Sequence, residues 1–211
     1  SFQDQRLPEL VKRFKLRKQE RFGLFAAAPP VLPSDGLLET LRYNAPLAAD
    51  IGTEKARSEL IVAPILVELK RRHRPDISLF SGVEFSVAPE EGLSGVCDFL
   101  LSRSPAQLFV TAPVVALVEA KNENIREGIG QCLAEMLAAQ RFNEHEGNAI
   151  PTVYGAVTTG TTWKFLSLTG RDVTLDLDLR SSLLMDNQHH TLDHVFQPIR
   201  FIEVTAELVQ G

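Results

Sequence analysis

Hydrophobic positions recur at helical spacing in three parts of the chain. Residues 8–22, 54–74 and 125–142 each place apolar side chains three or four positions apart, which predicts one buried face of an α-helix. Thr53 is a good N-cap for the second helix, because its hydroxyl can accept a backbone N–H of the first turn. Pro64 lies inside that helix. Since proline lacks an N–H and clashes with the preceding turn, we expect a kink or a break there.

Strand patterns occupy the remainder of the middle of the chain. Six segments alternate or run continuously apolar, as β-strands do: 83–87, 95–102, 108–120, 151–157, 162–168 and 172–179. The run 114–118 is apolar at every position, so its strand is expected in the centre of the sheet. Gly160 marks a hairpin turn, and 172–179 is expected at the sheet edge. This order predicts an α/β (α+β) domain of three layers around a mixed central sheet.

Length and composition agree with a single domain. The chain has 211 residues, 44% of them hydrophobic, which suffices for one core. We divide it into an N-terminal helical extension (1–52) packed on the core, a core (54–180) and a C-terminal extension (181–211). No run of about 18 apolar residues exists and the first residues do not resemble a signal peptide, so no membrane segment is expected. With only two cysteines, a reduced cytoplasmic setting is the simpler expectation.

Charge is distributed unevenly along the chain. The formal net charge is -5, which argues against a protein that coats nucleic acid with its whole surface. Residues 11–22 nevertheless carry a net charge of +5, and residues 70–74 add four arginines and lysines. Residues 172–211 carry -5. The two basic segments could contact phosphates, although each could equally be a solvated helix face.

The strongest chemical signal stands at the end of the apolar strand. Glu119 and Lys121 point to the same face, because strand side chains alternate. Charges at the end of a buried strand need partners. Asp98 belongs to the preceding strand, and antiparallel pairing would bring it near Glu119. Two carboxylates at adjacent strand ends suit Mg²⁺ or Mn²⁺, and Lys121 could orient the attacking water.

Two further polar residues lie on the flanking helices. Glu59 is on the helix that contains Pro64, and Gln131 is on the helix that follows the Glu-x-Lys strand. Each has a simpler interpretation. A glutamate such as Glu59 is more often a paired structural charge, and a helical glutamine such as Gln131 is more often a surface residue.

The order of these motifs resembles the PD-(D/E)xK nuclease superfamily, over about residues 54–169. The motifs are Glu59 on a kinked helix, Gly-x-x-Asp ending at Asp98, Glu119-Ala120-Lys121, and Gln131. Cys97 stands where the superfamily name has proline. The segments Tyr154-Gly155-Ala156-Val157 and Trp163-Lys164-Phe165 are similar to strands of the restriction-subunit-like branch of this superfamily.

The resemblance implies a restriction-endonuclease-like αβββαβ core. It also implies metal ligation by Asp98, Glu119, the Ala120 carbonyl and Glu59, with Lys121 as base or water-positioning group and Gln131 in support. The expected activity is Mg²⁺-dependent hydrolysis of DNA, and a homodimer is an expected assembly because many nucleases of this fold dimerise. The alternative is a catalytically silent nucleic-acid-binding or assembly module on the same fold.

Other constellations are weaker. His189, His190 and His194 cluster with Asp193, but their spacing matches no zinc signature, and a polar loop is the simpler interpretation. No P-loop and no Gly-x-Ser-x-Gly motif is present. Trp163 is expected in the core of the hairpin, although an exposed tryptophan could stack on a base.

Overall fold

The computed structural model describes residues 1–24, 32–148, 150–177 and 180–181. The strands are β1 (Arg17–Arg21), β2 (Ser78–Ala88), β3 (Leu93–Ser102), β4 (Val114–Ala120), β5 (Thr152–Thr158), β6 (Thr162–Thr169), β7 (Asp172–Asp176) and β8 (Arg180–Ser181). The helices are α1 (Leu7–Arg13), α2 (Asp35–Ile51), α3 (Glu54–Arg57), α4 (Ala63–Arg72) and α5 (Ile125–His145). Short turns η1 (Phe2–Asp4), η2 (Ser58–Val62) and η3 (Pro89–Glu91) join them. No helix in these ranges is long and apolar enough to cross a membrane.

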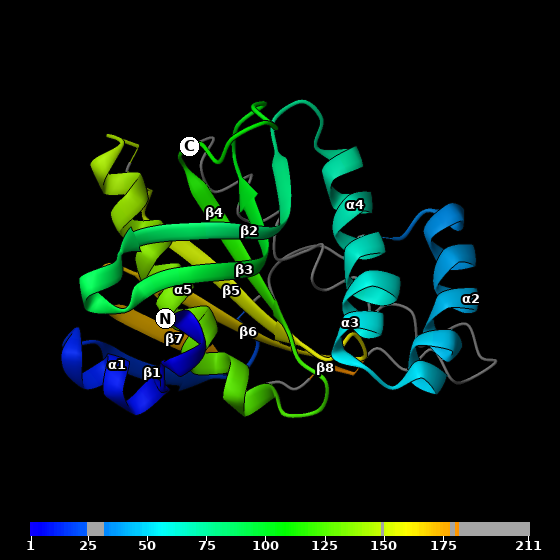
Figure 1. Ribbon diagram of the computed structural model, residues 1–211, viewed down its shortest axis with the longest axis horizontal. Coiled ribbons are helices and arrows are strands. Elements are labelled where there is room, and N and C mark those ends of the chain that lie inside the picture. Colours follow the sequence, from blue (N-terminus) through cyan, green and yellow to red (C-terminus); the bar gives the residue numbers. More distant parts are fainter. Residues whose placement is uncertain (25–31, 149, 178–179, 182–211) are drawn as a thin grey trace.

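A mixed sheet runs through the molecule with helices on both faces (Figure 1). Its strand order is β1-β7-β6-β5-β4-β3-β2, and β8 pairs with β6 off this path. The β4–β5 and β1–β7 pairs are parallel, and the other neighbours are antiparallel. The mixed α/β architecture predicted from the sequence is confirmed.

Two hydrophobic clusters lie between the sheet and its helices, one on each face of the sheet. One contains residues of α2, η2 and α4 with Val118 and Trp163, and the other contains residues of α1 and α5 with Leu117. Leu117 and Val118, which are adjacent in β4, enter opposite clusters because strand side chains alternate. All of β4 is buried, which confirms its predicted central place.

The prediction of one helix over residues 8–22 is wrong. Helix α1 ends at Arg13, and Lys15 adopts a positive φ of 52°, which an α-helix does not allow. The chain then returns as β1, parallel to β7. Therefore β7 lies inside the sheet, contrary to the edge position expected for it, and β1 forms the edge. Its five residues are exposed and mostly charged, which discourages pairing with another chain.

The helix interrupted by Pro64 has the predicted irregularity, and its cause is visible. Between α3 and α4 the chain makes the π-helical turn η2, and Pro64 stands in the first turn of α4. Proline cannot donate to the carbonyl four residues earlier, that of Leu60. Asn44 on α2 fills this vacancy, because its Nδ2 donates to Leu60 O at 2.9 Å. The sequence indicates one or two helical turns at most over residues 37–42, whereas α2 covers Asp35–Ile51.

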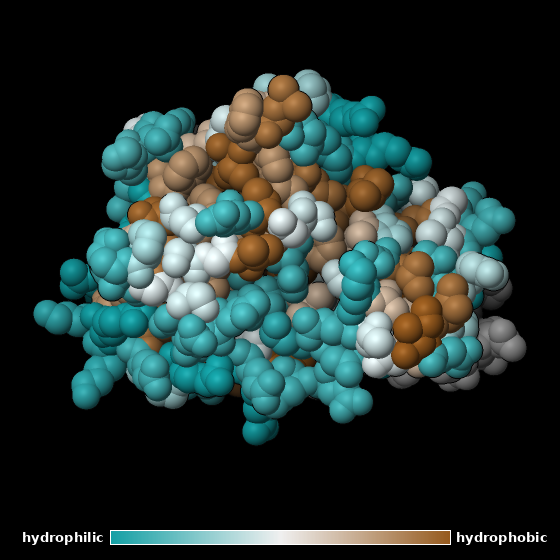
Figure 2. All heavy atoms as spheres, in the orientation of Figure 1, coloured by the Kyte–Doolittle hydropathy of each residue, from teal (hydrophilic) through white to brown (hydrophobic). Residues whose placement is uncertain are grey.

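Strand β4 begins six residues later than predicted. Pro113 has no N–H for the ladder, and β4 starts at the next residue, where Asn143 of α5 bonds both backbone groups of Val114 at 2.7 and 2.8 Å. Leu108 and Phe109, expected in the strand, are 88% and 77% exposed. Figure 2 shows hydrophobic side chains gathered at the top of this view, over the β3–β4 connection. The predicted β3, α5, β5 and β6 are confirmed with small changes at their ends.

Close packing of α5 against the N-terminal segment yields a stability prediction. A Cβ at Gly130 would collide with the carbonyl oxygen of Gln5 and lie 3.0 Å from Cα of Arg6. Gly130→Ala should therefore lower the free energy of unfolding by about 1–3 kcal/mol in urea titrations. Gly36→Ala in α2 is the matched control, since its nearest neighbour would lie 4.0 Å away. It should leave stability unchanged or slightly higher, and equal losses in both variants would refute the packing argument.

Candidate functional site

The pairing of β3 with β4 places Asp98 beside Glu119. Phe99 is the last residue of β3 in register with β4, opposite Val118. Beyond this pair, Asp98 Oδ2 accepts the backbone N–H of Ala120 at 2.9 Å. The Asp98 side chain thus holds the end of β4, while its carboxylate remains partly exposed.

Strand β3 changes face at Asp98. Phe99 packs in the cluster beneath α4 and Cys97 in the cluster beneath α5, although residues two apart share one face of a regular strand. On β2, Gly82 lies between the partners of these two residues and has φ of 61°. Only glycine adopts that conformation readily, so Gly82 permits the irregularity that brings Asp98 to the surface.

Glu119 is the most deeply buried of the predicted site residues. It is 1% exposed, and its Oε1 accepts a hydrogen bond from Lys121 Nζ at 2.5 Å. Burial, reinforced by the charge of Asp98, raises the pKa of Glu119 to about 8, although Lys121 acts in the opposite direction. Burial lowers the pKa of Lys121, but the carboxylates of Glu119, Glu54 and Asp98 outweigh it and raise the pKa overall. Lys121 is therefore the resident cation of this site.

Glu135 on α5 is a site residue that the sequence analysis missed. It is fully buried, and burial together with the charges of Glu119 and Asp98 raises its pKa well above the usual range. No described residue donates to Oε2 of Glu119 or of Glu135, and the two carboxyls lie close enough for each to change the pKa of the other. A proton shared between the two carboxyls would satisfy both oxygens while no cation is bound. The available signal was position: Glu135 follows Gln131 by one helical turn on a helix of small apolar residues.

Gln131 supports the site through Glu135. Its Nε2 donates to Glu135 Oε1 at 3.3 Å, and the residue is 5% exposed. The simpler interpretation of Gln131 as a surface residue is therefore wrong. The chain Gln131, Glu135, Glu119 and Lys121 connects α5 to the end of β4.

Glu59 stands apart from this buried group. Its side chain is 59% exposed and bonds Lys55 Nζ at 2.6 Å, as a paired charge would. It nevertheless lines a hollow of about 260 Å³ together with Glu54, Asp98 and Ala120. The structure thus brings Glu59 to the same opening as Asp98, on the exposed side of the site.

The donor set suits a hard divalent cation in its chemistry. Asp98 and Glu119 offer carboxylate oxygens, and Glu119 Oε2 is buried with no donor among the described residues. A cation could take the place of the proton shared with Glu135 at this buried oxygen. Within the described ranges no three Asp, Glu, His or Cys side chains already converge on one point. A magnesium ion there would need the Ala120 carbonyl and water as further ligands, which magnesium commonly accepts.

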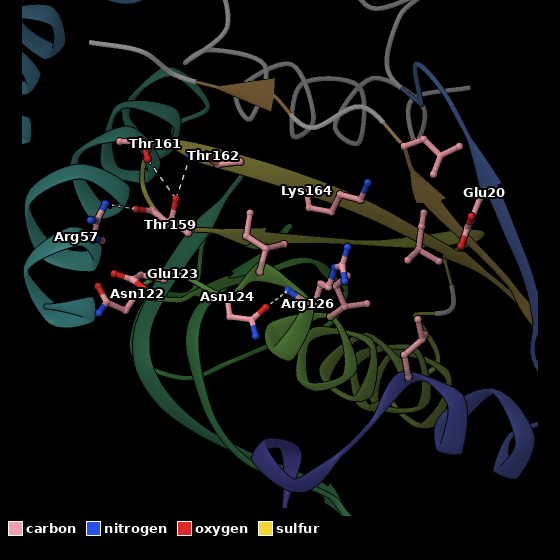
Figure 3. A pocket seen from close by; sticks show the side chains of 15 residues that line it. Glu20, Arg57, Asn122, Glu123, Asn124, Arg126, Thr159, Thr161, Thr162 and Lys164 are labelled. Carbon is pink, nitrogen blue, oxygen red and sulfur yellow. Dashed lines mark hydrogen bonds between the residues drawn. The ribbon is translucent and has the colours of Figure 1, made fainter. Parts of the chain in front are cut away.

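A larger groove opens directly beyond Lys121. Its volume is about 910 Å³, and it is formed by the turn before α5, the first turn of α5, the β5–β6 hairpin and β6. Figure 3 shows Arg126 and Lys164 extending into the space between α5 and β6, with Arg57 and Thr159 at the far end. The functional region therefore has an acidic hollow and an adjoining groove that cationic, neutral polar and aliphatic side chains line together.

The remaining sequence candidates do not join this site. Trp163 is fully buried, and its ring stacks on that of Phe165 with 6.3 Å between the ring centroids. This confirms its predicted place in the hairpin core. The cluster of His189, His190, His194 and Asp193 lies outside the described residues. The basic segments are partly neutralised, since Arg17 pairs with Asp172 at 2.5 Å and Arg72 with Glu68 at 2.9 Å.

The buried carboxyl of Glu119 predicts a pH dependence of stability. The unfolded chain releases this proton near pH 4.5, whereas the folded chain retains it to about pH 8. Stability in metal-free buffer should therefore fall as the pH rises between these values, because the unfolded state then binds fewer protons. Glu119→Gln should reduce this slope in urea titrations at several pH values, and Glu135, whose pKa is also raised, should account for the slope that is left. The control Glu84→Gln, at an exposed acid on β2, should preserve it, and an unchanged slope in Glu119→Gln would contradict the assignment.

Comparison with known proteins adds no relative to this picture. No protein-family model, no curated protein and no solved structure matches the chain. The residues of the site and their geometry are therefore the basis on which its chemistry is inferred.

Proposed function

We propose that this chain is a metal-dependent nuclease that hydrolyses phosphodiester bonds in DNA. The observation that carries the proposal is the meeting of Asp98, Glu119 and Lys121 where β3 and β4 separate, with Glu135 and Gln131 behind them. The order α4, β2, β3, β4, α5, β5 also fits the αβββαβ core of restriction-endonuclease-like proteins. Both features support the family resemblance of the sequence.

The proposed roles follow from where each side chain lies. Asp98 and Glu119 would hold Mg²⁺ or Mn²⁺ with the Ala120 carbonyl, and Glu59 would complete the surroundings from the rim of the hollow. When bound, the ion supplies positive charge to the phosphate and lowers the pKa of a water ligand. Lys121, released from its bond with Glu119, would orient the attacking water. Glu135 would hold Glu119 in place from behind.

One observation favours a silent binding module as the second candidate. The bond between Lys121 and Glu119 already neutralises one carboxylate. Together with the net charge of -5, it describes a site that is stable without an ion and without a large basic footprint. Such a module would bind nucleic acid and leave it intact.

Cleavage of plasmid DNA with Mg²⁺ or Mn²⁺ tests the proposal. Asp98→Asn should reduce the rate at least about a hundredfold, because it removes a carboxylate ligand. Lys121→Ala should reduce it by a similar factor, since proton-transfer and water-positioning groups contribute about 10²–10⁴-fold. The matched control is Asp50→Asn, which makes the same change at an exposed position on α2 and should retain full activity.

The outcomes separate the two candidates. Equal cleavage by wild type, Asp98→Asn and Lys121→Ala would refute the assigned site. DNA binding without cleavage in either metal would support the silent module. Thermal unfolding of each variant should accompany the assay, so that loss of activity is not confused with loss of fold.

A further inference from the structure

The groove beside Lys121 is lined by cations from three separate elements. Arg57 comes from α3, Arg126 from the first turn of α5 and Lys164 from β6. Neither Arg126 nor Lys164 forms a salt bridge with any residue that the structure describes. Arg57 donates from its Nη1 to Thr159 O at 3.3 Å, while its Nε is buried without a partner in the described part of the chain. The Arg126 guanidinium and the Lys164 ammonium group are therefore available to anions.

The acidic residues of the groove do not cancel these cations. Glu20 bonds Lys18 Nζ at 2.7 Å, which compensates most of its charge, and it attracts Lys164 more weakly from a distance. Glu123 is exposed at the rim. The groove is therefore a local positive region in a chain whose formal net charge is -5. A low-dielectric concave wall strengthens the attraction of such a region for phosphate.

The other groups in the groove suit a sugar–phosphate backbone. The N-terminus of α5, a helix of 21 residues, opens here with Asn124 as its N-cap, and its dipole favours negative charge. Asn122 and the threonines of the β5–β6 turn add neutral hydrogen-bonding groups. None of the described lining residues is aromatic, so base stacking is not provided. Such a surface would contact the backbone and not distinguish base sequence.

The groove and the acidic hollow meet at one short segment. Asn122, which lines the groove, follows Lys121 directly, and its N–H donates to Glu54 Oε2 at 3.1 Å. Glu54 lines the hollow, while Arg57 of the same helix α3 lines the groove. Helix α3 thus stands between a region suited to a cation and a region suited to phosphates. A strand lying in the groove would therefore lead toward Lys121 and Asp98.

We propose that this groove binds the backbone of a single polynucleotide strand on one side of the phosphate to be cut. The proposal rests on the nuclease function proposed above. It adds that Arg126 and Lys164 contact flanking phosphates. Binding should consequently be sensitive to salt and indifferent to sequence.

Fluorescence anisotropy with a labelled single-stranded oligonucleotide tests the groove without catalysis, in EDTA and low salt. Arg126→Glu/Lys164→Glu should weaken binding at least about tenfold. The control Arg42→Glu/Arg171→Glu makes the same change in net charge at exposed residues outside the groove and outside both basic segments, and should alter the Kd less than about twofold. The milder Arg126→Gln/Lys164→Gln should lower the slope of log Kd against log salt by about 1.4, from about 0.7 for each lost phosphate contact. Its measurement guards against misfolding of the charge-reversed protein.

The results distinguish the groove from the nuclease. Equal weakening by both double charge reversals, or no binding by wild type, would overturn the groove. Undiminished cleavage by Arg126→Glu/Lys164→Glu would also overturn it while leaving the nuclease intact. Binding that depends on Arg126 and Lys164 in a protein that cuts nothing would uphold the groove and reject the nuclease. An oligonucleotide of different base sequence should bind with the same Kd.

Discussion

The burial of Glu119 is the constraint on which the rest of the site depends. A carboxyl that is 1% exposed at the end of a central strand is costly unless neighbouring groups compensate it. Here the compensation comes from two directions, since Lys121 bonds one oxygen and Glu135 approaches from α5. Gln131 then donates to Glu135, so the position of α5 against the sheet is fixed by polar contacts as well as by packing. An apolar side chain at position 119 could fill the same space without the free-energy cost of burying a carboxyl. The acid at this position is therefore better explained by a chemical role than by stability.

The acidic and the basic side chains of the site lie in two separate regions. Acids gather in and behind the small hollow, whereas Arg126 and Lys164, which form no salt bridge within the described residues, lie in the larger groove beyond α3. Like charges repel within each region, but a bound ion and a polyanion would each relieve the region it enters. The weak overall charge of the chain is therefore compatible with nucleic-acid binding, because the local field in the groove matters more than the sum.

The sequence predicted strands and helices best where a pattern was long and continuous. The apolar run of β4, the small-residue pattern of α5 and the hairpin at Gly160 all had local causes, so their elements could be anticipated. The N-terminal strand could not, because β1 is exposed on both faces and owes its conformation to pairing with β7, a partner far along the chain. Asp98, Glu119 and Lys121 could be placed together from strand order alone. Glu135 could not, since its burial depends on how α5 crosses the sheet.

The π-helical turn between α3 and α4 sets how far one helix is rotated relative to the other. A π turn holds one residue more than the α-helix needs, so removing a residue from Ser58–Val62 would rotate α3 against α4 by roughly 100°. Ile61 and Val62 face the core and would keep α4 in place. Glu54 and Arg57 would then turn away from the segment at Asn122 that they now flank. The extra residue thereby sets the rotation of α3, which lies between the acidic hollow and the groove. The hydrogen bond from Asn44 on α2 to Leu60 O holds the π turn in this conformation.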